Sequence, residues 1–96
     1  MTIIKEIDGS KVTLALEGWL DTQASPMLLE ELDHLEDGIS SMVLDFSGLE
    51  YISSTGVRAV VLAYKKMHGA LVVKGASPSV FNIFRSTGID KNIPFE

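Results

Sequence analysis

The sequence contains no cysteine, which excludes disulfide bonds, thiolate metal sites and a thiol nucleophile. It also lacks long apolar runs, because the longest, such as Ala59–Tyr64, are far shorter than the ~20 residues that a membrane span needs. The N-terminal segment MTIIKEIDG has no apolar core of a signal peptide. These absences predict a cytoplasmic protein that does not insert into a membrane.

Basic residues are also few. Eight lysines and arginines stand against thirteen acids, which gives a net charge of −5. A surface of this sign repels a phosphate backbone and suits a partner with a basic patch. We therefore expect no direct contact with nucleic acid.

Arrangements of residues that carry catalysis or bind cofactors are missing as well. The two histidines, His34 and His68, have no metal-ligand spacing, and the phosphate-loop pattern GxxxxGK[ST] is absent. A triad of Ser54, His68 and Asp45 fails because fourteen residues separate Ser54 from His68 on one predicted helix, about 20 Å of rise. The sequence predicts neither an enzyme nor a bound cofactor.

The composition indicates one packed domain over residues 1–96, since 46% of the residues are hydrophobic and 22% are charged. Short apolar or alternating runs predict the strands, and Asp8-Gly9 between the first two predicts a hairpin. The expected strands are Thr2–Ile7, Lys11–Leu16, Ser41–Phe46 and Ala70–Lys74, with a short edge strand at Ile93–Phe95; Ser47–Tyr51 is expected to be a connection.

Cap residues predict three helices. Ser25-Pro26 begins the first, which Gly38 ends; the second opens at Ser53–Gly56 and ends at Gly69; Ser77-Pro78 begins the third, which Gly88 ends. The apolar residues recur with the helical period. Those expected to face inward are Ala24, Leu28, Leu32, Leu35, Val57, Val60, Val61, Tyr64, either Met67 or His68, Val80, Phe81 and Phe84. The predicted fold is α/β, with a mixed four- to five-stranded sheet in which an antiparallel hairpin precedes parallel strands.

Three consecutive hydroxyl residues, Ser53, Ser54 and Thr55, lie where a strand leads into the second helix. In one interpretation, one hydroxyl caps the helix and the others are ordinary turn residues. In the other, the unpaired N–H groups and the positive end of the helix dipole make a phosphate site. Ser53 is the best candidate for the cap, which places Thr55 in the first turn.

The whole chain resembles the STAS-domain family, the anti-sigma factor antagonists or anti-anti-sigma factors. The predicted order of strands and helices matches that family, and so do three stretches of sequence in the expected order. The residues that carry the resemblance are Gly18-Trp19-Leu20-Asp21, Leu44-Asp45-Phe46-Ser47 and Tyr51-Ile52-Ser53-Ser54-Thr55-Gly56-Val57-Arg58.

The resemblance implies a phosphorylation switch at the start of the second helix. The family pattern is Asp-Ser-Ser-Gly, whose second serine is the acceptor; that position falls on Thr55, and the first serine falls on Ser54. The family aspartate falls on Ser53, which is a departure that changes the charge beside the acceptor. The expected surroundings of the phosphosite are Asp21, Asp45, Ser53 and Gly56.

Beyond the acceptor, the resemblance implies a docking surface and partners. Arg58, Ala59 and Leu62 border the acceptor and are expected to contact a partner, although a solvated helix face explains the outward position of Arg58 and Leu62 equally well. Asp21 has a second interpretation as a helix cap, and Asp45 as a strand-end turn residue.

The function that the resemblance implies is that of a bacterial anti-sigma factor antagonist. It would bind an anti-sigma factor that is also a serine kinase, with a phosphatase as a further partner, and so regulate sigma-factor-dependent transcription. The alternative is a STAS interaction subunit of a transporter or lipid-transport complex that contacts its partner without phosphorylation. We expect a monomer when the chain is free.

Overall fold

A hairpin opens the fold. Strand β1 (Thr2–Asp8) pairs antiparallel with β2 (Lys11–Leu20). Gly9 in the turn has a φ of +62°, a conformation that glycine adopts without steric cost. The hairpin predicted from Asp8-Gly9 is confirmed.

The computed structural model describes residues 1–96 and contains one four-stranded sheet in the order β1-β2-β3-β4. Strands β3 (Ser41–Ile52) and β4 (Leu71–Lys74) both run parallel to β2. The predicted mixed sheet is therefore confirmed. The expected fifth strand is reduced to a single parallel bridge between Val73 and Phe95.

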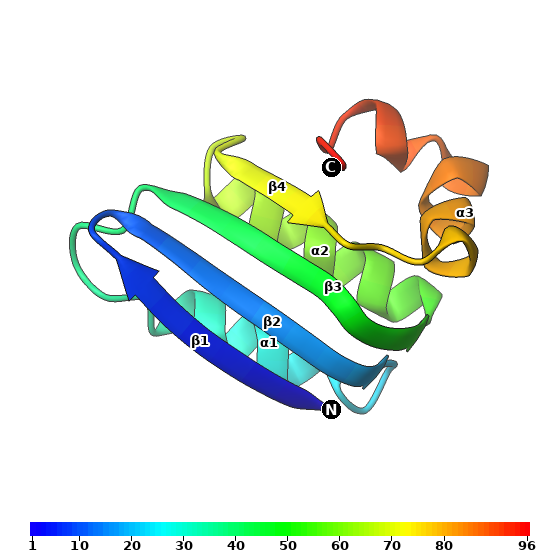
Figure 1. Cartoon of the computed structure of the whole chain (residues 1–96), viewed down its shortest axis with the longest axis horizontal. Helices are drawn as coiled ribbons and strands as arrows, with labels where there is room; N and C mark the ends of the chain where they lie inside the picture. Colours follow the sequence, from blue (N-terminus) through cyan, green and yellow to red (C-terminus); the bar gives the residue numbers. More distant parts are fainter.

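The helices cover one face of the sheet and one end of it (Figure 1). Helices α1 (Ser25–Asp33) and α2 (Ser54–Lys66) lie behind the sheet in this view. Helix α3 (Pro78–Thr87) follows β4 at the end of the sheet and leads into the short 3-10 helix η1 (Ile89–Lys91). No helix has the length and apolar character needed to cross a membrane.

The core lies between the sheet and its helices. Alternate residues of β2 and β3 point into it, as the period of a half-buried strand requires. The three helices add one apolar stripe each, and Met67, rather than His68, takes the last inward position of the second stripe. The largest fully buried side chains include Leu14, Leu16, Leu20, Leu28, Met42, Leu44, Phe46, Ile52, Leu71, Phe84 and Ile93.

The first helix differs from the prediction at both ends. Its N-cap is Ala24, and Ser25 is instead the first helical residue, buried with its hydroxyl donating to the carbonyl oxygen of Asp21 at 2.7 Å. The N–H of Ala24 donates to Oδ1 of Asp21, a residue that precedes the helix. At the other end the helix stops at Asp33, well before Gly38.

Strand β3 is longer than predicted. The segment Ser47–Tyr51, expected to be a connection, continues the strand to Ile52. Its pairing with β2 shifts register at two places, between Ala15 and Glu17 and between Gly18 and Trp19. These bulges let a stretch with turn-like residues stay within the ladder, and local sequence does not reveal them.

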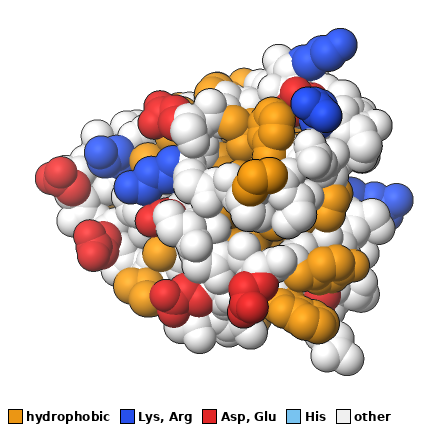
Figure 2. Space-filling view, turned by 45° about the vertical axis from the view of Figure 1, so that its right-hand side comes forward, with side chains coloured by type: hydrophobic (Ala, Val, Ile, Leu, Met, Phe, Trp, Pro, Cys, Tyr) orange, Lys and Arg blue, Asp and Glu red, His pale blue; other side chains and the backbone are white.

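The other face of the sheet carries no helix (Figure 1). Three large hydrophobic side chains of the sheet are well exposed there: Ile4, Trp19 and Tyr51. Figure 2 shows this side obliquely, with hydrophobic side chains gathered at its centre and along its lower right. The sheet is therefore half-covered, with one face packed and one face open to solvent.

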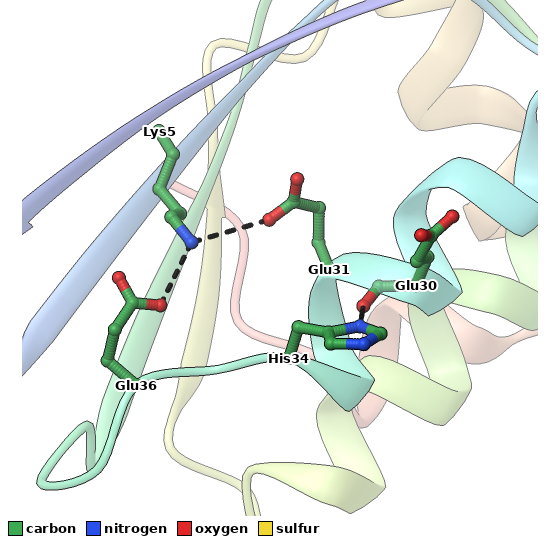
Figure 3. Close-up of polar contacts among 5 residues, drawn as sticks. All are labelled: Lys5, Glu30, Glu31, His34 and Glu36. Atoms are coloured by element: carbon green, nitrogen blue, oxygen red, sulfur yellow. Dashed lines mark hydrogen bonds and ion pairs between the residues drawn. The ribbon is translucent and has the colours of Figure 1, made fainter.

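Both ion pairs of the chain tie β1 to the helical layer through Lys5 (Figure 3). Lys5 Nζ donates to Glu36 Oε1 at 2.9 Å and lies 3.6 Å from Glu31 Oε2. The hydrogen bond raises the pKa of Lys5 and lowers the pKa of Glu36. Beside them, His34 Nδ1 lies 2.9 Å from the carbonyl oxygen of Glu30. An exposed edge strand is thus joined to α1 and the segment after it.

The start of α2 is pressed against the end of β2. The N–H of Ser53 donates to the carbonyl oxygen of Leu20 at 3.0 Å. One turn later, a Cβ atom on Gly56 would overlap that same oxygen and would lie 2.8 Å from Ile52 Cγ1. Only glycine therefore lets the first turn of α2 approach the sheet this closely.

Replacing Gly56 with alanine tests this contact, because helix propensity and the steric overlap predict opposite changes in the free energy of unfolding. Helix propensity alone would make Gly56→Ala stabilising by about 0.5–1 kcal/mol. Because the overlap is with backbone, we expect instead a loss of about 2 kcal/mol or more in the free energy of unfolding, measured by urea titration.

Ser54→Ala, an exposed first-turn position of the same helix, is the matched control and should change stability by less than about 0.5 kcal/mol. A Gly56→Ala variant as stable as the parent would contradict the close approach.

Candidate functional site

Three hydroxyls lie at the start of α2, at an accessible end of the helix. Ser53 is the N-cap, with extended backbone geometry, and its Oγ accepts from the N–H of Gly56 at 3.1 Å. Ser54 is exposed and Thr55 is half-buried. The cap predicted at Ser53 is confirmed, and neither of the other two hydroxyls is enclosed in the core.

The amides of this first turn are available to an anion. The helical ladder begins with the bond from Val57 N to Ser53 O, and Ser53 Oγ occupies the N–H of Gly56. The N–H groups of Ser54 and Thr55 precede this ladder and have no acceptor within the helix. The positive end of the helix dipole lies at the same place.

Thr55 is joined to the loop that precedes α1. The hydroxyl of Thr22 donates to Thr55 Oγ1 at 3.2 Å. Thr22 was not among the predicted site residues. The available signal was its place directly after Asp21, in the loop that the family resemblance brings toward the acceptor.

Asp21 holds this loop in shape. Its Oδ1 accepts from the N–H of Ala24 at 2.9 Å, and its carbonyl oxygen accepts from both the N–H and the hydroxyl of Ser25. The interpretation of Asp21 as a cap of the entry turn is therefore confirmed, whereas α1 itself has Ala24 as its N-cap and no side-chain cap. Because Thr22 follows Asp21 directly, the same cap positions the threonine that meets Thr55.

Asp45 lies apart from the helix start. Its Oδ1 accepts from the hydroxyl of Ser47 at 2.6 Å and from the N–H of Ser47 at 2.9 Å. These two bonds, with a smaller contribution from the charge of Lys74, lower the pKa of Asp45. β3 continues to Ile52, so roughly 20 Å of strand separates Asp45 from the cap. No hydrogen bond or ion pair joins Asp45 to Thr55, and its expected place in the surroundings of the phosphosite stays a prediction.

The outward face of α2 next to the hydroxyls contains Arg58 and Leu62. Both are exposed, Leu62 to 50%, and they are one turn apart. Ala59, expected to contact a partner, is only 2% exposed and packs in the core, so that prediction is wrong. Its position follows from the helical period, which places residue 59 on the same side as the buried Ala63 and Val60.

A shallow hollow of about 260 Å³ lies between the start of α2 and the end of α3. Ser54 and Arg58 line one side of it, and Thr87 and Ile89 line the other. The first turn of α2 is therefore flanked by the Thr22 loop on one side and by α3 on the other.

This arrangement suits an acceptor of a phosphoryl group. The side chain of Thr55 is hydrogen-bonded to another hydroxyl and to no carboxylate or imidazole, so the chain itself offers it no general base. The free amides and helix dipole favour an anion once it is present.

Comparison with known proteins agrees with this architecture. A family model described as Mlab, STAS domain, matches residues 3–94. BtrV of Bordetella bronchiseptica, provisionally named an anti-sigma factor antagonist, is 33% identical over an alignment of 87 residues that covers 86% of this chain and 74% of that protein.

Two solved structures share the fold. An anti-sigma factor antagonist from Mycobacterium paratuberculosis superposes with a TM-score of 0.86 at 23% identity, covering 98% of this chain and 83% of that one. The Bacillus cell fate determinant SpoIIAA in its phosphorylated form gives a TM-score of 0.71 at 16% identity, covering 99% and 91%. With a family match over nearly the whole length, the chain belongs to the STAS-domain family of anti-sigma factor antagonists.

Proposed function

We propose that this protein is a cytoplasmic anti-sigma factor antagonist that binds its anti-sigma factor through the start of α2 and is switched by phosphorylation of Thr55. Binding would free a sigma factor and so regulate transcription. The observation that carries the proposal is the accessible first turn of α2, where Ser54 and Thr55 stand at an exposed end of the helix.

The partner would supply the chemistry of the switch. In the proposed step the γ-phosphoryl group passes from ATP to Thr55 Oγ1, ADP leaves, and the hydroxyl proton passes to a base of the kinase. The Thr22 hydroxyl, which already donates to Thr55 Oγ1, would remain beside the phosphate. Thr55 is favoured over Ser54 because it occupies the acceptor position of the family pattern.

Charge explains how one phosphate would release the partner. It adds about −1.5 to −2 charges to a surface with a net charge of −5. A hundredfold loss of affinity requires about 2.8 kcal/mol, and like charges or a buried unpaired charge at an interface cost several kcal/mol. The helix dipole offsets only about 0.3–1 kcal/mol of that. Repulsion therefore dominates if the helix start lies inside the contact.

Ser53 supports a second candidate, an interaction subunit of a transporter or lipid-transport complex that is not phosphorylated. Ser53 replaces the family aspartate while keeping the cap, since its Oγ accepts from Gly56 N. The fold is preserved, but the charge beside the acceptor is lost. A kinase that recognises the negative charge of the family aspartate would not bind this helix start.

Phosphorylation is tested by incubating the protein with ATP and the ATP-binding anti-sigma factors of its own organism. We expect one added phosphate, located on Thr55 by mass spectrometry of the peptides. Thr55→Ala should abolish the modification and Ser54→Ala should retain it. Phosphate on Ser54 would refute the acceptor assignment, and an unmodified chain with an active kinase would favour the second candidate.

Docking of the anti-sigma factor at the start of α2 is tested by placing a glutamate at the same position of the first turn in α2 and, separately, in α3. Thr55→Glu should weaken the complex with the anti-sigma factor at least about tenfold, measured by isothermal titration calorimetry. Ser79→Glu is the matched control, because Ser79 is exposed and stands two residues after the Ser77 cap of α3, as Thr55 does after Ser53. Equal affinities of the two variants would count against docking at α2.

A further inference from the structure

Two aromatic side chains lie together on the open face of the sheet. Trp19 of β2 is 57% exposed and Tyr51 of β3 is 45% exposed. Their ring centroids are 5.5 Å apart, with the planes tilted by 56°. Tryptophan is mostly buried in folded proteins, so a pair exposed to this degree marks a contact surface.

The backbone holds this pair outward. Trp19 and Tyr51 are partners in the ladder directly after a register shift, and Gly18 at the shift has a φ of +99°. The next pair, Leu20 and Ile52, is buried against the helices. Since strand side chains alternate, Trp19 and Tyr51 face away from the core. Bulges that redirect a side chain in this way are common beside functional sites.

Acidic groups without a basic partner accompany the rings. Glu17 and Glu50 are both exposed, and both ion pairs of the chain use Lys5 with other acids. Glu17 stands two residues before Trp19 on β2, so it lies on the same open face by strand alternation. It packs against Gly48 of β3, where a Cβ would come within 2.9 Å of its Cγ. Figure 2 shows acidic side chains beside the hydrophobic ones at the lower edge of this view.

The charge asymmetry extends well beyond the patch. Between Lys11 and Arg58 the sequence has no lysine or arginine. The same stretch carries most of the thirteen acids: Glu17, Asp21, Glu30, Glu31, Asp33, Glu36, Asp37, Asp45 and Glu50. Neither Glu17 nor Glu50 forms an ion pair with a cation of the protein itself.

We propose that Trp19, Tyr51 and Glu17 form a docking site for an arginine carried on an extended segment of a partner protein. The guanidinium stacks on the aromatic faces and donates to the carboxylate. Arginine fits better than lysine, because its planar group stacks on rings and donates to a carboxylate with two parallel bonds. Nucleic acid does not fit, since the acids beside the rings repel phosphate.

This site goes beyond the proposed switch, and only its approach from a partner seated at α2 rests on the proposed function. Tyr51 stands two residues before the Ser53 cap, and Trp19 stands three before Thr22, so the rings occupy the same end of the sheet as the helix start. Because strand side chains alternate and the neighbouring Leu20 and Ile52 are buried against the helices, the two rings lie on the opposite face of the sheet from α2. A partner seated at α2 can therefore extend a segment around the sheet end to reach them.

The test uses Trp19 as its own reporter, because it is the only tryptophan in the chain. The probe is the blocked peptide acetyl-Gly-Arg-Val-Arg-Gly-amide, titrated into ¹⁵N-labelled protein while the indole N–H resonance is followed by NMR. The same peptide with citrulline in place of arginine keeps the shape and removes the charge. We expect a saturable shift with the arginine peptide and none with the citrulline peptide.

Variants locate the site. Glu17→Gln and Tyr51→Leu should each weaken the arginine peptide severalfold to about tenfold. Glu30→Gln is the matched control, because it makes the same charge change at an exposed acid on α1, and it should leave the affinity within about twofold.

Three results would overturn the proposal: no saturable shift, equal binding of the citrulline peptide, or equal losses in Glu17→Gln and Glu30→Gln. An indole shift that depends on protein concentration without peptide would assign the patch to a second copy of the chain instead. None of these results bears on whether Thr55 is phosphorylated, which is measured separately.

Discussion

The carbonyl oxygen of Leu20 is the contact on which the geometry of the helix start depends. It accepts from the N–H of Ser53 and lies where a side chain on Gly56 would have to go. One point at the end of β2 therefore fixes both the cap and the first turn of α2. The loop that follows Leu20 then brings Thr22 to Thr55, so strand, loop and helix converge on one hydroxyl.

This convergence relates the fold to regulation. The chain belongs to a family of regulators that act by binding rather than by catalysis. A rigid and exposed helix end suits the proposed switch, because a phosphate there would change the surface of the protein without unfolding its core. Ser53 Oγ and Asp21 Oδ1 serve that rigidity by accepting hydrogen bonds from backbone N–H groups, one in the first turn of α2 and one in the loop before α1.

Several features set by neighbouring residues were predictable from the sequence, although the cap expected at Ser25 and the helix end expected at Gly38 were not found, and the bulged pairing of β2 with β3 was not predictable. The Asp8-Gly9 turn and the caps at Ser53 and Ser77 each depend on a few adjacent residues, and the structure has all of them. The extension of β3 depends on bulged pairing with β2, and the Thr22–Thr55 bond joins positions far apart in the chain. Patterns among neighbouring residues do not predict the bulged pairing of β3 or the Thr22–Thr55 hydrogen bond.

Hydrogen exchange of the protein, alone and bound to its anti-sigma factor, tests most directly whether the first turn of α2 lies inside the contact. The account predicts that the amides of residues 54–58 gain protection in the complex, while those of β1 at the opposite edge of the sheet exchange as before. Protection confined to other elements, with exchange unchanged at the start of α2, would contradict it.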